Sequence, residues 1–249
     1  MSSNGGGYKA PSIEALAEMY KGANICVVAQ GPTASRDFSQ YSDAENTPGE
    51  PWYVWTQNGG WKAHPESSLA FIMDDLKSDI WGENKRFNRA EIEKVIKETE
   101  IPLITSQAYP DFPALVEFPL KQAAEKIPLV NGSLNLNETV NYMIALGILF
   151  EVARMDFWGM DYYSPDGKSI RADKRACCEF WIGMAAMAGI KIRTCINSDL
   201  MRYDLHRPDI ELEGVYGYEQ DKLPDEVLNM LDILPGGRAK IKIGALNGG

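Results

Sequence analysis

The sequence has few of the residues from which metal centres and imidazole chemistry are built. Its 249 residues include only two histidines and four cysteines, and the cysteines form no CxxC pair and have no histidine at metal-ligand spacing. A zinc site is therefore not expected, and buried free thiols are the better interpretation. Any imidazole general base has to be His64 or His206.

Positive charge and long apolar runs are also scarce. The formal net charge is -10, with 25 Lys and Arg against 35 Asp and Glu, which disfavours wrapping a nucleic acid. The longest apolar run, residues 142–152, is about half of what spans a bilayer and contains Glu151. The first residues lack the basic start and apolar stretch of a signal peptide. We expect a cytoplasmic protein without a membrane partner or extensive nucleic-acid binding.

Short apolar runs alternate with helix-like segments along most of the chain. Strands are predicted at residues 23–29, 52–56, 68–73, 101–106, 155–158 and 190–195, and helices at 11–20, 87–99, 138–152 and 172–188. Asn137 is the expected cap of the third helix, and residues 119–126 fit a short helix or an edge segment. The alternation predicts an α/β fold: a Rossmann-like, doubly wound, mostly parallel sheet with helices on both faces, in a single domain.

The domain boundaries follow from the same pattern. Residues 1–10 are rich in glycine and serine and predict a flexible tail, and residues 11–222 carry the Rossmann-like domain. Residues 223–249 predict a C-terminal helix and an edge segment. The chain has no Walker, GxGxxG, GxSxG or HExxH motif, so the best-known nucleotide, serine hydrolase and zinc protease signatures are absent.

Polar residues follow the predicted strands, where a parallel α/β sheet binds its ligand. They are Gly31, Asn58, Asp74, Ser106 and Asp161. If the strands are parallel, the loops that carry these residues form one rim. We therefore expect a ligand-binding site at this rim.

The turn after the first predicted strand is the best candidate for binding a phosphate. Gly31 has no side chain, which lets backbone amides approach an anion, and beyond Pro32 the hydroxyls of Thr33 and Ser35 can donate to it. The alternative is a plain Gly-Pro turn. Asp161 could bind a ribose hydroxyl or order its own turn.

Two residues are candidates for catalysis. Asp74 could hold Mg²⁺ against ligand phosphates, or Asp74 and Asp75 could cap the next segment. His206 lies in a polar loop after the strand that ends near Cys195, closer to the proposed rim than His64, and is the candidate base; the alternative is a surface histidine with no catalytic role.

The order of these motifs resembles the MptE-like hydroxymethylpterin diphosphokinase superfamily and the bacterial sialyltransferases that use a CMP-activated sugar. The likeness is carried by residues 25–29 and 31–33, Asn58, residues 65–74 and residues 139–161. It implies that the Gly31 turn, Asn58 and Thr139 contact a nucleotide. Ala29 and Thr33 stand where those families have the first glycine and the serine of G-x-G-P-S; threonine keeps the hydroxyl, whereas Ala29 leaves less room for a pyrophosphate.

A second resemblance covers the C-terminal half. Arg175 and the runs 178–183 (CEFWIG), 198–200 (SDL) and 216–219 (YGYE) are similar to an uncharacterised family of tailed-bacteriophage proteins. Together the resemblances imply a phage-encoded, nucleotide-binding transferase, glycosyltransferase-like, with a nucleotide-activated donor; a diphosphokinase that uses Asp74 and a metal is a close variant. The alternative is a non-catalytic phage structural or morphogenetic protein that assembles with other phage proteins. The first role places the chain in the host cytoplasm and the second in the virion.

Overall fold

The computed structural model describes residues 8–31, 52–74, 76, 89–127, 132–162, 172–195, 198 and 200–201. They belong to the compact unit Met1–Met201, and the chain's other unit, Arg202–Gly249, lies outside the described residues. The described strands are β1 (Asn24–Val28), β2 (Trp52–Gln57), β3 (Ser67–Ile72), β4 (Leu103–Thr105), β5 (Leu115–Glu117), β6 (Arg154–Trp158) and β7 (Lys191–Thr194).

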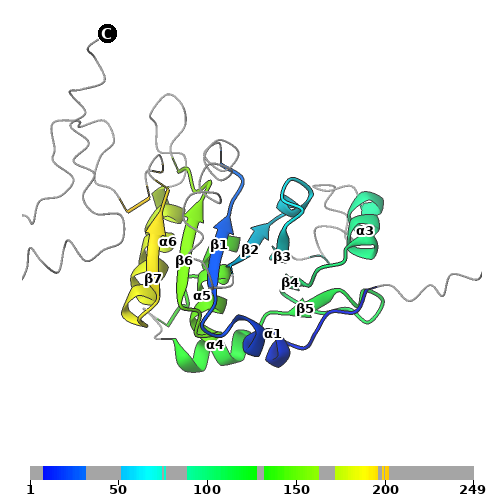
Figure 1. Ribbon diagram of the computed structural model, residues 1–249, viewed down its shortest axis with the longest axis horizontal. Coiled ribbons are helices and arrows are strands. Elements are labelled where there is room, and N and C mark those ends of the chain that lie inside the picture. Colours follow the sequence, from blue (N-terminus) through cyan, green and yellow to red (C-terminus); the bar gives the residue numbers. More distant parts are fainter. Residues whose placement is uncertain are drawn as a thin grey trace, which may run out of the picture. The chain divides into compact units, whose positions relative to one another are not determined.

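These seven strands form one sheet in the order β5-β4-β3-β2-β1-β6-β7, which Figure 1 shows from right to left. Every neighbouring pair is parallel. The carboxyl ends of all seven strands therefore lie at the same edge of the sheet, as the sequence predicts. In β1 every residue is buried, which is typical of a central parallel strand covered on both faces.

Helices cover both faces of the sheet. The described helices are α1 (Ile13–Tyr20), the 3-10 turn η1 (Gly60–Lys62), α3 (Arg89–Glu98), α4 (Leu120–Lys126), α5 (Thr139–Leu149) and α6 (Ala172–Met187). Buried residues of α1, α4, α5 and α6 share one core cluster with one set of strand side chains, whereas α3 packs on the opposite set. The connection from β3 to β4 thus runs over one face, and the connections from β5 to β6 and from β6 to β7 run over the other. The predicted doubly wound fold is therefore confirmed.

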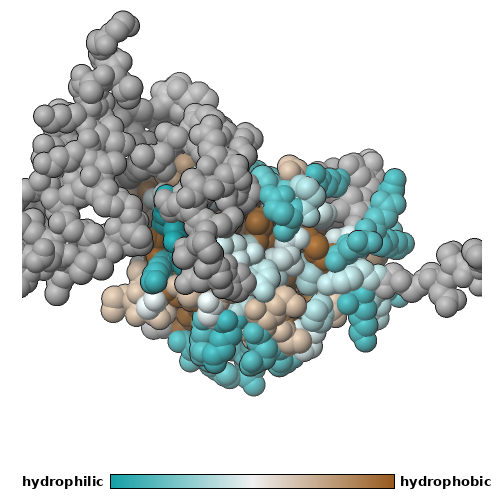
Figure 2. Space-filling model, in the orientation of Figure 1, coloured by the Kyte–Doolittle hydropathy of each residue, from teal (hydrophilic) through white to brown (hydrophobic). Residues whose placement is uncertain are grey.

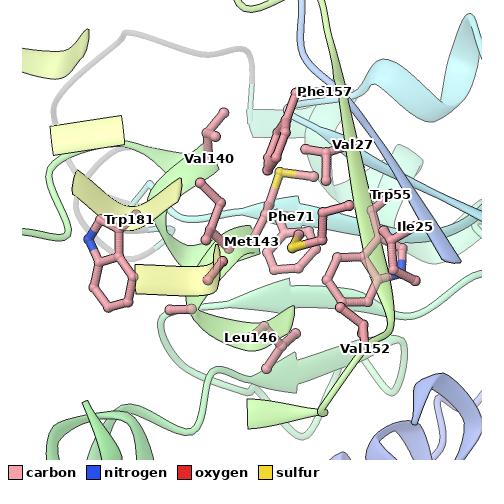
Figure 3. Close-up of a cluster of buried hydrophobic side chains, with 14 of the residues drawn as sticks. Ile25, Val27, Trp55, Phe71, Val140, Met143, Leu146, Val152, Phe157 and Trp181 are labelled. Carbon is pink, nitrogen blue, oxygen red and sulfur yellow. The ribbon is translucent and has the colours of Figure 1, made fainter. Parts of the chain in front are cut away.

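The larger core lies between the sheet and α5 (Figure 3). Val27 of β1 and Phe157 of β6 lie in this cluster with Met143 of α5, and Ile25 of β1 lies beside Trp55 of β2. The helix approaches β6 closely, because a Cβ on Gly147 would lie 2.7 Å from the sulfur of Met155. None of the described helices is long and apolar enough to cross a membrane, and the described surface in Figure 2 shows only small hydrophobic patches between hydrophilic side chains.

The opposite sheet face contains a buried ion pair. Asp156 of β6 is fully buried, and its carboxylate accepts from Nε and Nη2 of Arg154 at 2.7 and 3.0 Å. The guanidinium also lies over the ring of Trp52, 5.1 Å from the centroid. Cys26 is the cross-strand neighbour of Asp156, and burial, with a smaller contribution from the Asp156 charge, raises the pKa of Cys26 to about 12.

The structure differs from the sequence prediction at three places. Strand β5 was not predicted, because it has three residues between Pro113 and Pro119 and so has the composition of a loop. The undecided segment 119–126 contains helix α4. Asn137 is not the cap of α5: Glu138 holds that position, and the Asn137 side chain instead accepts from the Asn141 amide at 2.8 Å.

The cysteines are free, as expected. Three of them are buried, and the fourth, Cys177, is half-buried. The prediction of buried free thiols is therefore confirmed for Cys26, Cys178 and Cys195.

Candidate functional site

The order in which the chain adds strands to the sheet reverses at β1. From β1 the strand order continues through β2 to β5 on one side and resumes with β6 and β7 on the other. In open α/β sheets the ligand crevice lies beyond the carboxyl ends of the strands at such a switch point. Here the carboxyl ends of β1 and β6 lead into the turn at Gly31 and into residues 159–161. We call these two loops, together with Asn58 at the end of the neighbouring β2, the switch site.

At the switch site the loops after β1 and β6 are in contact. The N–H of Gly31 donates to the carbonyl of Gly159 at 2.8 Å. A Cβ on Gly31 would lie under 3.0 Å from both that carbonyl and the carboxylate of Asp161, so no other residue fits there without movement. The missing side chain thus serves the approach of two loops, and the Gly31 N–H is engaged by the protein. A ligand-binding role for Gly31 stays a prediction.

Asn58 is held against the same turn from the other side. The side-chain amide of Gln30 donates to the Asn58 carbonyl at 3.0 Å, and the Asn58 N–H donates to the Phe71 carbonyl at 2.9 Å. Asn58 and Gly59 both have left-handed backbones, with φ of 48° and 87°, a conformation that asparagine and glycine tolerate best. The exposed Asn58 side chain is therefore carried at the carboxyl end of β2, next to β1.

Asp74 and Ser106 lie on the same edge but farther along it. Asp74 is half-buried just beyond β3, and Ser106 is exposed directly after β4. With neighbouring strands about 4.8 Å apart, β3 and β4 are about 10 and 14 Å from β1. The edge is thus shared as predicted, and among the candidates that the structure describes at strand ends, the switch site brings together Gly31, Asn58 and Asp161.

The described residues contain no group of three or more His, Cys, Asp or Glu that could hold a metal ion. Asp74 as a metal ligand and as a catalytic residue stays a prediction. Pro32, Thr33, Ser35, Asp75 and His206 lie outside the described residues. Their expected roles also stay predictions.

The amino end of α5 borders the switch site through a short hydrogen bond. Tyr162, next to Asp161, is buried, and its hydroxyl donates to the carboxylate of Glu138 at 2.5 Å. Glu138 is the N-cap residue of α5, and Thr139, half-buried, is the first residue of that helix. Thr139 thus directly follows the residue that bonds to Tyr162, and its expected contact with a nucleotide stays a prediction.

Burial sets the protonation of this cluster. It raises the pKa of Tyr162, and the nearby Cys178 and Glu138 raise it further. Burial likewise raises the pKa of the Cys178 thiol. The phenol therefore remains a neutral hydrogen-bond donor and the thiol is unreactive at neutral pH. Sequence analysis missed Glu138 and Tyr162, since their only signal was that each adjoins a predicted site residue.

The loop after β6 is fixed on its far side as well. The Ser198 hydroxyl is buried and donates to the carbonyl of Met160 at 2.7 Å, and it accepts from the N–H of Leu200 at 3.2 Å. Residues 159–162 are thus tied to β1, to α5 and to the segment after β7. Asp161, which is half-buried, thus lies in a loop that is hydrogen-bonded to three other parts of the chain.

Fold and site together define a doubly wound, parallel α/β protein with polar loops gathered at its switch point. No protein-family model and no curated protein matches the chain. Among solved structures it is similar to the sialyltransferase CstII from Campylobacter jejuni in complex with CMP-3FNeuAc, with 18% identity, a TM-score of 0.39, and coverage of 71% of this chain and 82% of that chain.

Two further structures of sialyltransferases show the same degree of likeness. CstII with cytidine-5'-monophosphate matches at 15% identity and a TM-score of 0.41, over 70% of this chain and 81% of that one. A variant of CST-II in which one tyrosine is replaced by phenylalanine, in complex with CMP, matches at 12% identity and a TM-score of 0.40, over 71% and 82%. With TM-scores below 0.5 these matches carry no argument, and the fold class rests on the sheet itself. The resemblances to MptE-like and phage proteins stay predictions.

Proposed function

We propose that the chain binds a nucleotide-activated sugar at the switch site and acts as a glycosyltransferase-like transferase. One observation carries the proposal: the loops of Gly31, Asn58 and Asp161 come together where a doubly wound sheet has its ligand crevice. Asp161 is half-buried, and a carboxylate in such a loop accepts hydrogen bonds from ribose hydroxyls.

The phosphate side of the ligand is assigned to the turn beyond Gly31 and to the start of α5. The Gly31 N–H is engaged and Pro32 has none, so the phosphate donors in this proposal are Thr33 and Ser35. Thr139, at the positive end of an eleven-residue helix, favours a nearby anion. Asn58 is proposed to contact the nucleotide from the β2 side.

In the transfer, the acceptor oxygen forms a bond to the anomeric carbon while the bond from that carbon to the phosphate oxygen breaks. The electron pair leaves with the nucleotide, and the acceptor proton goes to a general base. His206 and Asp74 are the proposed bases. Asp74 could instead hold Mg²⁺, which would neutralise the departing phosphate.

Calorimetry with CMP, UDP and ATP, with and without Mg²⁺, tests the proposal. We expect the wild-type chain to bind one of them, and Asp161→Asn and Asn58→Ala to weaken binding about tenfold or more, because a hydrogen bond to a charged group is worth about 1.5–3 kcal/mol. Glu117→Gln is the matched control, since Glu117 is exposed on the edge strand β5. It should leave affinity unchanged.

The outcomes separate the related functions. Preference for ATP that depends on Mg²⁺ and on Asp74 would support the diphosphokinase variant. A wild-type chain that binds none of the three nucleotides would overturn the transferase proposal. The assembly-protein alternative would then be tested by mass spectrometry of purified virions.

A further inference from the structure

A second site lies at the opposite edge of the sheet. A pocket of about 370 Å³ that is open to solvent lies between the connection from β2 to β3 and the turn from α3 into β4. Its lining includes Trp61, Lys62, Pro65, Glu98, Glu100 and Ile101. Ser67, which also lines it, is the first residue of β3, so the pocket adjoins the amino ends of the strands and is distinct from the switch site.

The apolar wall of the pocket is held by the core. Trp61 and Ile101 are half-buried and pack against the cluster formed by residues of β3, α3 and β4, such as Ala70, Ile96 and Leu103. Trp61 therefore both packs on the core and lines the pocket. An aromatic side chain in a pocket lining favours ligands that present an apolar face.

The polar side chains around this wall define the charge of the ligand. Two carboxylates, Glu98 and Glu100, stand against one ammonium group, Lys62, and a second lysine, Lys94, reaches Glu98 at 4.0 Å from outside the pocket. This balance disfavours a phosphorylated ligand. Carboxylates accept from hydroxyl groups and an ammonium donates to them, so a neutral ligand with several hydroxyls can bond to all three side chains in addition to their existing contacts.

We propose that this pocket binds a saccharide ring, with the apolar face of the ring on Trp61 and its hydroxyls on Lys62, Glu98 and Glu100. A sugar ring combines the two properties that the lining selects, a flat C–H face and a rim of neutral donors and acceptors. The volume is at the lower end of the range of about 300–1,000 Å³ for small-ligand pockets. The inference is independent of the proposed function, since the pocket shares no residue with the switch site.

The test uses the full chain labelled with nitrogen-15 and titrated with methyl glucoside, methyl galactoside, N-acetylglucosamine and cellobiose. The indole N–H signal of Trp61 is assigned as the one lost in Trp61→Phe. We expect this signal to shift with one of the sugars. Trp61→Ala should weaken binding about tenfold, the loss that follows from removing an aromatic contact of about 1.5 kcal/mol.

Glu100→Gln is a second variant, because Glu100 is exposed and its replacement leaves the fold intact. We expect it to weaken sugar binding, whereas Glu117→Gln, at the carboxyl end of the edge strand β5 and so away from the pocket, should not. If none of these sugars moves the Trp61 signal, the proposal is overturned. It is also overturned if the signal responds to ethylammonium chloride and to no sugar, because the two carboxylates would then select a cation. Sugar binding that Trp61→Ala leaves intact and Asp161→Asn abolishes would also overturn it.

The test remains distinguishable from that of the switch site. Sugar binding at Trp61 is measured without nucleotide, and nucleotide binding is measured with Asp161→Asn and Asn58→Ala. Failure of one therefore leaves the other standing.

Discussion

Gly31→Ala tests how closely the loops of the switch site are packed. The new Cβ would lie under 3.0 Å from the Gly159 carbonyl and the Asp161 carboxylate. The backbone angle of Gly31 is not in the left-handed region, so the whole effect comes from overlap of atoms. The Gly159 carbonyl belongs to the backbone and accepts from Gly31 itself at 2.8 Å, which means that it cannot move away without loss of this hydrogen bond.

Overpacking of this kind destabilises a fold by about 1–3 kcal/mol. For a unit of about 200 residues, 1 kcal/mol corresponds to a change in Tm of about 2–4 °C. We therefore expect Gly31→Ala to lower the Tm by about 4–8 °C, from a loss near 2 kcal/mol. Urea unfolding and differential scanning calorimetry measure the two quantities.

Gly183→Ala is the matched control. A Cβ at that position of α6 meets no atom within 4 Å, and alanine in a helix interior is favoured over glycine by about 1 kcal/mol. This variant should be more stable than wild type. If Gly31→Ala unfolds at the same Tm as wild type while Gly183→Ala behaves as expected, the close packing of Gly31 against Asp161 is wrong.

Three further predictions concern the buried polar groups. Asp156→Asn leaves Arg154 without its buried partner charge, and urea unfolding should show a loss of about 3–5 kcal/mol. Tyr162→Phe removes the hydroxyl that donates to Glu138, a loss of about 1.5–3 kcal/mol in the same assay. Burial raises the pKa of Cys26 from 9.0 to about 12, so above pH 9 the unfolded thiol releases its proton while the folded one keeps it; stability should fall as pH rises from 9 toward 12, and Cys26→Ala should reduce this slope.

Each of these has a control within the chain. Glu151→Gln breaks an exposed pair with Lys21 and should have no measurable effect, unlike Asp156→Asn. Tyr109→Phe removes an exposed hydroxyl contact of 3.4 Å with Gln107 and should leave the free energy of unfolding unchanged. If Tyr162→Phe changes that free energy no more than Tyr109→Phe does, the hydrogen bond from Tyr162 to Glu138 does not stabilise the fold. For the thiol, an unchanged slope in Cys26→Ala above pH 9 would contradict the prediction and show that other buried groups with raised pKa values, such as Tyr20 and Cys178, account for the alkaline loss.

Part of the site could be read from the chain because strands and turns are local patterns. The run at residues 25–28 is apolar at every position and ends at Gln30-Gly31, which marks both a central strand and the turn beyond it. The same reasoning placed Asn58, Asp74 and Ser106 at strand ends. It could not rank them, because distance from β1 depends on strand order, which no local pattern encodes.

The sequence by itself determined the class of fold, since alternating buried strands and helices can bury their apolar faces only in a layered α/β sheet. Tertiary structure decided where the sheet reverses, and so which loops meet. It alone showed that Gly31 is needed for the approach to Asp161, that Tyr162 bonds Glu138, and that Trp61 lines a pocket at the other edge. These contacts join residues far apart in sequence, and their geometry exists only once the strands have taken their places.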